Sequence, residues 1–345
     1  MTDSEHETSI ISADEALAGL AEDAADETDD AAVEYRDIIV PVQNHGARLD
    51  RALADTVAEF SRNYLQQLIG CGCVLLNGQV CAKPSARVKV SDRLRIELKP
   101  TPQSLAFRPE AMALDIVFED EFLLVINKPA GLVVHPAPGN WSGTLLNGLL
   151  ARDAKAAQLP RAGIVHRLDK DTSGLMVIAR QRPAMDALTR MIAARGVSRK
   201  YLALAHGAWK GALRRQVDLP VGRDPRNRLR MAVVDLQKNA GKTASTELLL
   251  LQGTAEYCLV QCTLQTGRTH QIRVHMAALD HPLVSDQVYG GQPVPGLGRQ
   301  ALHAFRLAFD HPVLGVALAF VSPPPADLSA TLDVLGLGYN EAAES

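Results

Sequence analysis

The 345-residue chain has no apolar run of about eighteen residues, the length that a membrane-spanning helix needs. Its N-terminal region is acidic and lacks the basic stretch followed by an apolar one that marks a secretory signal. The glycine-rich fingerprints of nucleotide-binding loops are also missing. We therefore expect a cytoplasmic protein that uses no nucleotide cofactor. Because 47% of the residues are apolar, the chain can bury a sizeable core.

Cysteine is scarce as well, and its odd number of five favours reduced thiols over a disulfide framework. Cys71, Cys73 and Cys81 lie close together in the sequence and leave a metal site open as an alternative. They form no C-x-x-C pair and have no histidine nearby, however, so we interpret them as small buried side chains. Neither a metal nor another cofactor is expected.

Positive charge is absent from residues 1–34, which contain twelve Asp and Glu and no Lys or Arg. An acidic segment of this composition predicts a disordered tail. Without it, the chain has 36 basic and 27 acidic residues, which is a formal charge of +9. That balance suits a polyanionic partner, although charge alone does not identify one.

Residues 45–98 have the pattern of a compact α/β module. Two helical stretches, 48–59 and 62–69, end at a glycine. The Asn-Gly pair at 77–78 predicts a two-residue hairpin, and alternating polar and apolar residues over 92–98 predict a half-buried strand. Eight basic and five acidic residues give the module a formal charge of +3.

This module resembles the alpha-L RNA-binding module, which was first recognised in a ribosomal protein of the small subunit. The likeness rests on R-L-D-R-A-L, S-R-N-Y-L-Q-Q-L-I, V-L-L-N-G with K-P, and D-R-L-R-I. It implies RNA contact through Arg62, Lys83 and their neighbours. A charged α/β appendage without a ligand is the alternative. The module indicates the class of partner and leaves the chemistry open.

A linker and a larger domain follow the module. Three prolines within residues 99–113 predict the linker, residues 114–336 form the domain, and residues 337–345 a C-terminal tail. Many strands with few crossover helices predict an α+β fold with a mixed, mainly antiparallel sheet. Strands are expected at 116–118, 123–127, 174–180, 199–206, 245–252, 256–264, 302–309 and 316–321, and helices at 144–152, 183–194, 270–279 and 326–336.

The densest chemical signal is A-G-I-V-H-R-L-D-K-D-T-S-G-L-M-V-I-A-R at residues 162–180, in which two apolar strands flank a polar loop. D-T-S-G alone would be an ordinary turn. A turn has no need for His166 and Arg167 before Asp169, nor for Lys170 after it. Cations on both sides would keep the Asp169 carboxylate ionised, as a nucleophile or a base requires.

The motif H-R-L-D-K-D-T-S-G resembles the active site of the RluA/RluD family of pseudouridine synthases. The resemblance implies a pseudouridine synthase fold with Asp169 as the catalytic carboxylate and no cofactor. It also implies that Arg167 fills the position of a flipped uridine, with His166 beside it at the RNA. Asp171 is interpreted as a residue that holds the loop through local hydrogen bonds.

Two later segments match the family in the required order. In S-R-K-Y-L-A-L-A-H-G, Tyr201 matches the family's active-site tyrosine and would stack on the flipped uracil, although a strand tyrosine is usually a core residue. Q-T-G-R-T-H-Q-I-R-V-H-M-A predicts a turn and a helix that Thr269 caps. His270 and Arg273 would share a helix face, and in the family this arginine pairs with the catalytic carboxylate. His270 and His275 lack the spacing of a zinc helix.

Two further segments match the framework of the family, N-K-P-A-G-L-V-V-H-P at 127–136 and D-H-P-L-V-S-D-Q-V-Y-G at 280–290, with Ser285 where a glycine is more usual. The basic segment 220–233 resembles the RluD branch and could grip phosphates through Arg223, Arg226 and Arg228, unless it is merely an exposed turn. That branch modifies the stem-loop of large-subunit ribosomal RNA that touches the decoding region. The expected partner is therefore large-subunit (23S) ribosomal RNA or a pre-ribosomal particle.

The function that the resemblance implies is RNA modification in ribosome biogenesis, by an isomerase that breaks the N1–C1′ bond of uridine and forms a C5–C1′ bond. The base must first be flipped out, which costs on the order of a few kcal/mol. We expect a monomer that binds neither DNA nor a membrane. A non-catalytic RNA-binding protein would have no reason to combine Asp169, Tyr201 and Arg273. A metal-dependent hydrolase would need clustered carboxylates or histidines. A family member acting on transfer RNA stays open as a third alternative.

Overall fold

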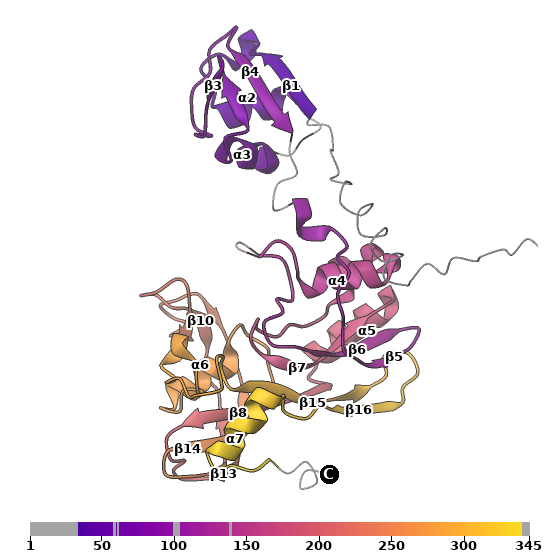
Figure 1. Cartoon of the computed structure of the whole chain (residues 1–345), viewed down its shortest axis with the longest axis vertical. Coiled ribbons are helices and arrows are strands. Elements are labelled where there is room, and N and C mark those ends of the chain that lie inside the picture. Colours follow the sequence, from indigo (N-terminus) through magenta and orange to yellow (C-terminus); the bar gives the residue numbers. More distant parts are fainter. Residues whose placement is uncertain (1–33, 58–59, 61, 99–103, 138–139, 340–345) are drawn as a thin grey trace, which may run out of the picture. The chain divides into compact units, whose positions relative to one another are not determined.

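The computed structural model describes residues 34–57, 60, 62–98, 104–137 and 140–339. The chain divides into two compact units, Met1–Gln103 and Ser104–Ser345, whose helices and strands are labelled in Figure 1. The predicted acidic tail lies outside the described residues except for Glu34, and so do residues 99–103 of the predicted linker. The predicted domain bounds themselves stay predictions. Within the described ranges, no helix is long and apolar enough to span a membrane.

The first unit is an antiparallel sheet with two helices against it. Its hairpin turns at Asn77 and Gly78, whose φ values of 53° and 82° are those that a tight two-residue turn requires. The sheet has the order β1-β4-β2-β3, and its first strand precedes the predicted module. The elements are β1 (Glu34–Ile39), η1 (Val42–Asn44), α2 (Leu49–Thr56), α3 (Arg62–Gly70), β2 (Val74–Leu76), β3 (Gln79–Val80) and β4 (Arg93–Leu98).

The second unit is built on a nine-stranded sheet. Its order is β5-β6-β7-β15-β8-β14-β13-β9, with β16 beside β15. Only the β7–β15 pair among the described strands is parallel, so the predicted mixed, mainly antiparallel α+β fold is confirmed. The strands are β5 (Ile116–Glu119), β6 (Leu123–Lys128), β7 (Ser173–Ala179), β8 (Val197–His206), β9 (Arg214–Val217), β13 (Thr246–Gly253), β14 (Tyr257–Leu264), β15 (Leu302–Asp310) and β16 (Ala317–Val321).

Helices and a small sheet complete this unit. A three-stranded sheet, which was not predicted, carries the basic segment in the connection between β10 and β11. Its strands are β10 (Val221–Arg223), β11 (Met231–Val233) and β12 (Gly241–Lys242). The helices are η2 (Ser104–Phe107), α4 (Leu145–Arg152), η3 (Ala154–Gln158), η4 (Pro160–Gly163), α5 (Arg182–Ala193), α6 (Gln271–Ala278), η5 (Gln287–Tyr289) and α7 (Ala326–Val334).

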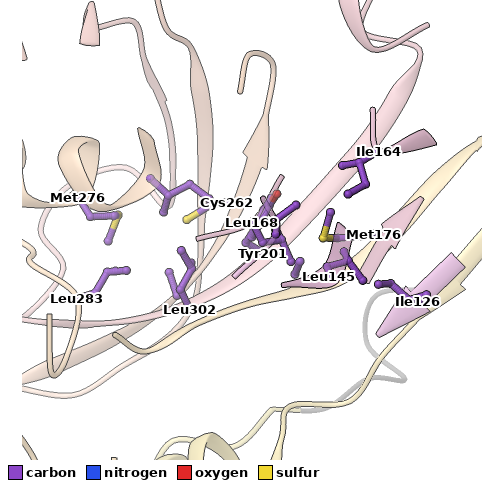
Figure 2. Close-up of a cluster of buried hydrophobic side chains, with 14 of the residues drawn as sticks. Ile126, Leu145, Ile164, Leu168, Met176, Tyr201, Cys262, Met276, Leu283 and Leu302 are labelled. Carbon is purple, nitrogen blue, oxygen red and sulfur yellow. The ribbon is translucent and has the colours of Figure 1, made fainter. Parts of the chain in front are cut away.

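The large sheet packs against helices on both faces, and every residue of its strand β7 is buried. On β7, Leu175 and Val177 pack with the residues of α5, whereas Met176 and Ile178 point to the other face, where α4 and α6 lie. Figure 2 shows this second cluster, which contains Tyr201. The main core therefore lies directly beneath the segments that carry the sequence motifs.

Gly174 is required where β7 meets β15. Its φ is +116°, and a Cβ atom there would lie 2.2 Å from the carbonyl oxygen of Ala304. No larger residue fits this approach of two backbones. Gly174 is a strand residue, as expected from the predicted strand 174–180, and β7 begins one residue earlier, at Ser173.

Parts of the predicted linker and tail pack on this unit. The Asn147 side chain donates hydrogen bonds to the carbonyl oxygens of Ala106 (3.3 Å) and Arg108 (2.8 Å), both in the predicted linker. Leu337, in the predicted tail, is only 2% exposed and packs with α7. The folded unit therefore extends beyond residues 114–336 at both ends.

Candidate active site

The polar loop runs from His166 to Thr172 and leads directly into β7. Leu168 lies between the polar residues Arg167 and Asp169. Its side chain is buried in the main core and anchors the loop there. Its turn is closed by the Thr172 N–H, which donates to the Asp169 carbonyl at 3.1 Å. The Asp169 side chain is 17% exposed and therefore lies at the boundary between core and solvent.

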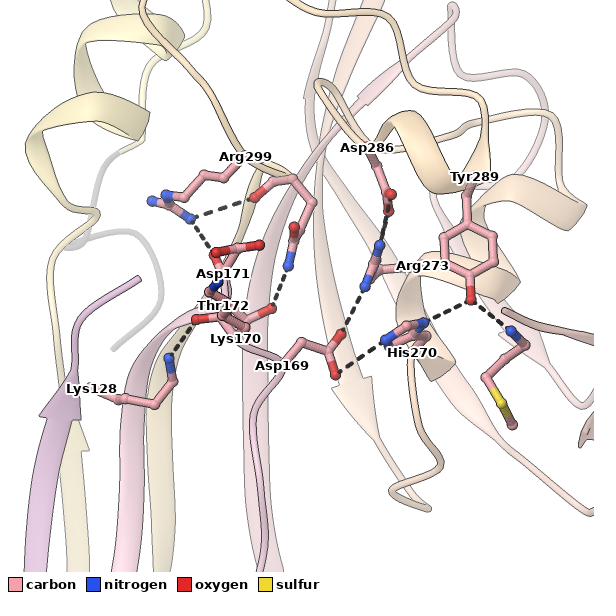
Figure 3. Close-up of polar contacts among 12 residues, drawn as sticks. Lys128, Asp169, Lys170, Asp171, Thr172, His270, Arg273, Asp286, Tyr289 and Arg299 are labelled. Atoms are coloured by element: carbon pink, nitrogen blue, oxygen red, sulfur yellow. Dashed lines mark hydrogen bonds and ion pairs between the residues drawn. The ribbon is translucent and has the colours of Figure 1, made fainter. Parts of the chain in front are cut away.

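Two buried cations hold the main chain of this loop (Figure 3). Lys128 is fully buried, and its Nζ donates to the carbonyl oxygens of Pro129 (2.8 Å), Leu132 (2.9 Å) and Lys170 (2.9 Å). Arg299 Nη1 donates to the carbonyl of Asp171 at 3.1 Å. Burial lowers the pKa of Lys128 to about 8. The loop is thus held through its carbonyl groups, and not through the Asp171 carboxylate as we expected.

The Asp169 carboxylate is paired with an arginine from α6. Arg273 Nη1 lies 3.3 Å from Asp169 Oδ2. The same guanidinium binds Asp286 at two points, with Nε–Oδ2 at 2.7 Å and Nη2–Oδ1 at 2.8 Å, and lies 4.9 Å from the Tyr289 ring centroid. Burial opposes its charge, but the hydrogen bond with Asp286 and the nearby carboxylates raise the pKa of Arg273. Asp286 therefore fixes the arginine that orients Asp169.

The cations next to Asp169 in the sequence are not its partners in space. Arg167 and Lys170 are exposed, and within the described residues neither forms an ion pair with Asp169. The charge that faces the carboxylate comes from Arg273, which is 104 residues away. A loop presents neighbouring side chains in different directions, so sequence adjacency was the wrong guide here.

Helix α6 begins differently from the prediction. Its N-cap is His270, in the left-handed region at φ 56°, and Thr269 makes no cap. Instead, the Gln271 side-chain oxygen accepts from the Arg268 N–H (2.9 Å) and the Thr266 hydroxyl (2.8 Å), so a glutamine closes the turn. This backbone turns His270 toward the site, where its Nε2 lies 3.9 Å from Asp169 Oδ1.

His270 is held by Tyr289, whose hydroxyl lies 2.8 Å from His270 Nδ1 and accepts from the Met231 N–H at 3.1 Å. Because the phenol oxygen already accepts one hydrogen bond, we infer that it donates its own proton to Nδ1. The ring proton is then on Nε2, facing Asp169. Burial lowers the pKa of His270, while Asp169 acts in the opposite direction.

Tyr201 lies on β8 and is only 4% exposed, as part of the main core. It also lines a cavity of about 830 Å³ that contains Asp169, His270 and Arg273 in its wall. Burial raises the pKa of Tyr201 to about 12. The side chain is therefore a neutral phenol at physiological pH, so it can stack or donate a hydrogen bond but is not a phenolate base.

The cavity is strongly basic. Asp169 is the one acidic residue among the described residues of its wall. The wall also contains six arginines from separate segments of the chain, namely Arg161, Arg167, Arg195, Arg199, Arg268 and Arg273. A concave surface with this balance of charge attracts a polyanion.

Five of the predicted RNA-binding residues lie in the second unit, namely His166, Arg167, Arg223, Arg226 and Arg228. Arg167 and His166 both line the cavity, but Arg167 is exposed, whereas His166 is held by the fold because its Nε2 accepts from the Val177 N–H at 3.0 Å. Burial lowers the pKa of His166 to about 3, so the ring is neutral. Arg223, at the end of β10, is exposed, and so are Arg226 and Arg228 in the β10–β11 connection.

In the first unit, Lys83 is exposed, whereas Arg62 is held by a buried acid. Arg62 Nη2 lies 2.8 Å from Asp50 Oδ2, and Arg48 and Gln66 donate to the same carboxylate. The Arg62 side chain is still 52% exposed. Asp50 therefore presents Arg48 and Arg62 together as an ordered basic pair.

The sequence predictions missed several residues that build the site. Lys128 and Asp286 were included only as parts of framework segments, while Arg199 and Arg299 carried no signal of their own. Lys128, Asp286 and Arg299 gain their roles from contacts with the Lys170 carbonyl, Arg273 and the Asp171 carbonyl, respectively. Only the N-K-P motif, which puts Lys128 directly after the predicted apolar strand 123–127, could have indicated a buried amine.

The prediction that Cys71, Cys73 and Cys81 are buried holds only for Cys73. Cys258 and Cys262 are buried too, whereas Cys81 is half-buried and Cys71 is exposed. It follows α3, where the chain turns at the surface. Across the described parts of the chain, no group of three or more His, Cys, Asp or Glu residues could hold a metal ion.

Comparison with known proteins gives the family. Residues 122–278 match the family model described as RNA pseudouridylate synthase, and residues 47–94 match the S4 domain. Proteins named ribosomal large subunit pseudouridine synthase D are similar over most of the chain. The protein from Neisseria meningitidis serogroup B is 46% identical over 313 residues, which are 87% of this chain and 82% of that protein. The chain belongs to the RNA pseudouridylate synthase family.

Other members agree with this assignment. The synthase D of Xanthomonas campestris pv. campestris is 42% identical and spans 90% of this chain and 95% of that protein, and the one from Escherichia coli K12 is 41% identical over 86% and 93%. A solved structure, human RNA pseudouridylate synthase domain containing 4, superposes with a TM-score of 0.52 at 26% identity and covers 66% of this chain and 95% of that one. The prediction of an RNA pseudouridine synthase is confirmed.

Proposed function

We propose that this synthase converts uridine to pseudouridine in large-subunit (23S) ribosomal RNA, within the stem-loop that contacts the decoding region. The names of the relatives, all ribosomal large subunit pseudouridine synthases, support this substrate. The S4 domain in the first unit and Arg223, Arg226 and Arg228 in the second each offer basic side chains for contact with a folded RNA. The enzyme would meet free ribosomal RNA or a pre-ribosomal particle in the cytoplasm, as a monomer.

Asp169 is the proposed catalytic carboxylate, and the observation that carries this role is its position. It is the one described acid in the wall of a basic cavity, and Arg273 holds it from one side. The reaction needs a group that acts on the ribose or the base while the N1–C1′ bond breaks and the C5–C1′ bond forms. Attack on C1′, addition to the ring and removal of the C2′ proton are all open to this carboxylate.

Two further residues have proposed roles at the flipped nucleotide. Tyr201 offers an aromatic ring on the cavity wall, and the uracil can stack on it. Because burial raises the pKa of Tyr201 to about 12, we do not propose it as a phenolate that removes the C5 proton. Arg167, exposed at the same cavity, is placed to occupy the position that the uridine vacates.

The test is to locate pseudouridines in ribosomal and transfer RNA from a strain that lacks the protein. We expect sites in the decoding-region stem-loop of 23S RNA to disappear and to return when the wild-type chain is supplied. Supplying the Asp169→Asn variant, expressed at the same level, should not restore them. Loss of sites only in transfer RNA would replace the proposed substrate by the transfer RNA alternative.

A further inference from the structure

Arg199 is a buried arginine of the cavity wall without an acidic partner. It lies on β8 two residues before Tyr201, so both side chains leave the same face of the strand, and both line the cavity. The residue is only 6% exposed, and its Nε is shut off from solvent without an acceptor. No carboxylate in the described part of the chain pairs with it. Arg273, which is also 6% exposed, has two such partners.

A second unsatisfied donor lies in the wall of the same cavity. His166 Nε2 accepts a backbone N–H, so its ring proton is on Nδ1. This Nδ1 is buried and has no partner among the described residues, and the charge of Arg199 acts on the same ring. Both residues line the cavity. Native proteins rarely leave buried donors unpaired, so two together indicate an acceptor that the free protein lacks.

The chain also leaves room at the guanidinium. Gly267 passes next to it, and a Cβ atom at this position would lie 3.1 Å from Arg199 Nη1. A side chain there would cover the end of the arginine. The turn before α6 therefore keeps this end of the guanidinium uncovered.

We propose that Arg199, with His166 Nδ1, binds a phosphodiester of the RNA next to the target uridine. The proposal rests on the proposed RNA substrate. A buried cation without a counter-charge is costly, and a phosphate supplies both the missing charge and two unesterified oxygens that match the fork of a guanidinium. Uracil carbonyls could accept hydrogen bonds, but they are neutral and would leave the charge uncompensated. Arg199 is thus assigned as a positioning residue for the backbone of the flipped nucleotide.

The first arm of the test concerns the free protein. Arg199→Met replaces the cation by an apolar chain of similar length. If the guanidinium has no counter-charge until RNA binds, the melting temperature of the variant should equal or exceed that of the wild type, because an uncompensated charge has been removed. Inorganic phosphate should raise the melting temperature of the wild type more than that of Arg199→Met. A marked fall in melting temperature would give Arg199 a purely structural role and overturn the proposal.

The second arm measures binding to a stem-loop RNA in which single phosphates near the target uridine are neutral methylphosphonates. At one position, neutralisation should weaken wild-type binding about tenfold or more. The same change should have no further effect on Arg199→Met, and a partial effect on Arg199→Lys. Arg195→Met is the matched control. It removes an exposed arginine of the same cavity and should leave the effect of that phosphate intact.

Two results would overturn the assignment. If no phosphate couples to Arg199, the ligand is not the backbone. If 2-thio- or 4-thiouridine at the target couples instead, Arg199 reads the base. Turnover of unmodified RNA by the wild type is measured alongside. Absence of turnover with every RNA would refute the proposed function, whereas normal turnover without phosphate coupling would refute only the role of Arg199.

Discussion

Asp169 and Asp171 lie in one loop but have different surroundings. Asp169 faces the cavity and pairs with Arg273, whereas the described contact of Asp171 with Arg299 is through its carbonyl. Asp169→Asn should lower the rate of isomerisation by about three orders of magnitude or more, with RNA affinity nearly unchanged, because the amide keeps the shape and loses the charge. Asp171→Asn is the control and should stay within a few-fold of the wild type. Single-turnover pseudouridine formation measures both, and a rate of Asp169→Asn within about a hundredfold of the wild type would contradict the assignment.

Asp286 holds Arg273 in place, so its loss should lower both the stability and the activity of the protein. Asp286→Ala leaves a buried guanidinium with one weaker partner, and we expect the free energy of unfolding to fall by about 3 kcal/mol. Activity should fall too, since Asp169 loses its orientation. The double variant Asp286→Ala/Arg273→Met removes the orphaned charge and should recover part of the stability. Denaturant titrations of Asp286→Ala, Arg273→Met and the double variant provide the cycle, and additive losses would show that the pair is not coupled.

At this scale the sequence predicted the residues that belong to motifs and missed those that support them. Asp169, Tyr201 and Arg273 stand in recognisable contexts, and the structure brings all three to one cavity. Their supporting residues, such as Lys128 and Asp286, are ordinary in sequence and gain a role only from contacts across the fold. The motif H-R-L-D-K-D-T-S-G also suggested Arg167 and Lys170 as the partners of Asp169. A motif gives the order of residues along the chain and does not show where their side chains point.

Among the elements, β6 supports the active-site loop through the buried amine of its last residue, Lys128. Lys128→Met removes the donor to three carbonyl groups, two in the turn after β6 and one in the loop. Since each orphaned buried group is costly, we expect the free energy of unfolding to fall by about 3 kcal/mol or more and kcat to fall with it. Lys170→Met, at an exposed position of the same loop, should do neither. Unchanged kcat in a folded Lys128→Met protein would show that the loop does not need this support.

The predicted long strands and helices are all present, because runs of apolar residues with a clear period define them. The short strands β9 to β12 were missed, since two to four residues carry no period and pair only through the surrounding fold. The start of α6 was misplaced for a similar reason. Thr269 has the right residue type for a cap, but the side chain of Gln271 already satisfies the turn.

For the whole molecule, buried neutral histidines make the second unit sensitive to acid. His303 is held between Ser173 and Ser322, and burial lowers its pKa to about 4, against 6.5 in an unfolded chain. Between these two values the unfolded chain binds a proton that the folded protein does not. The free energy of unfolding should therefore fall as the pH falls through this window, by about 3 kcal/mol for this residue.

The check is to compare the wild type with His303→Gln. Acidic residues contribute to both proteins, so the difference between them isolates the histidine. Both tryptophans, Trp141 and Trp209, lie in the second unit, and their fluorescence reports its unfolding alone. The drop in unfolding free energy between pH 7 and pH 4 should be smaller in the variant. Equal drops would show that His303 does not titrate differently in the folded protein.

The division into two units predicts separate effects on RNA selection and on chemistry. Every residue proposed for catalysis lies beyond Ser104, while the predicted module alone carries a formal charge of +3. A chain that begins at Ser104 keeps the contacts of Asn147 with the predicted linker. Phosphate contacts mainly position RNA and release counterions, so their loss weakens binding and flattens its dependence on salt. We expect a higher KM on structured ribosomal RNA, with kcat at saturation little changed.

Folding of the truncated chain is checked first by tryptophan fluorescence. If the folded truncation bound RNA with full affinity and an unchanged salt dependence, the first unit would not select the RNA, and the arginines between β10 and β11 would be the next surface to test.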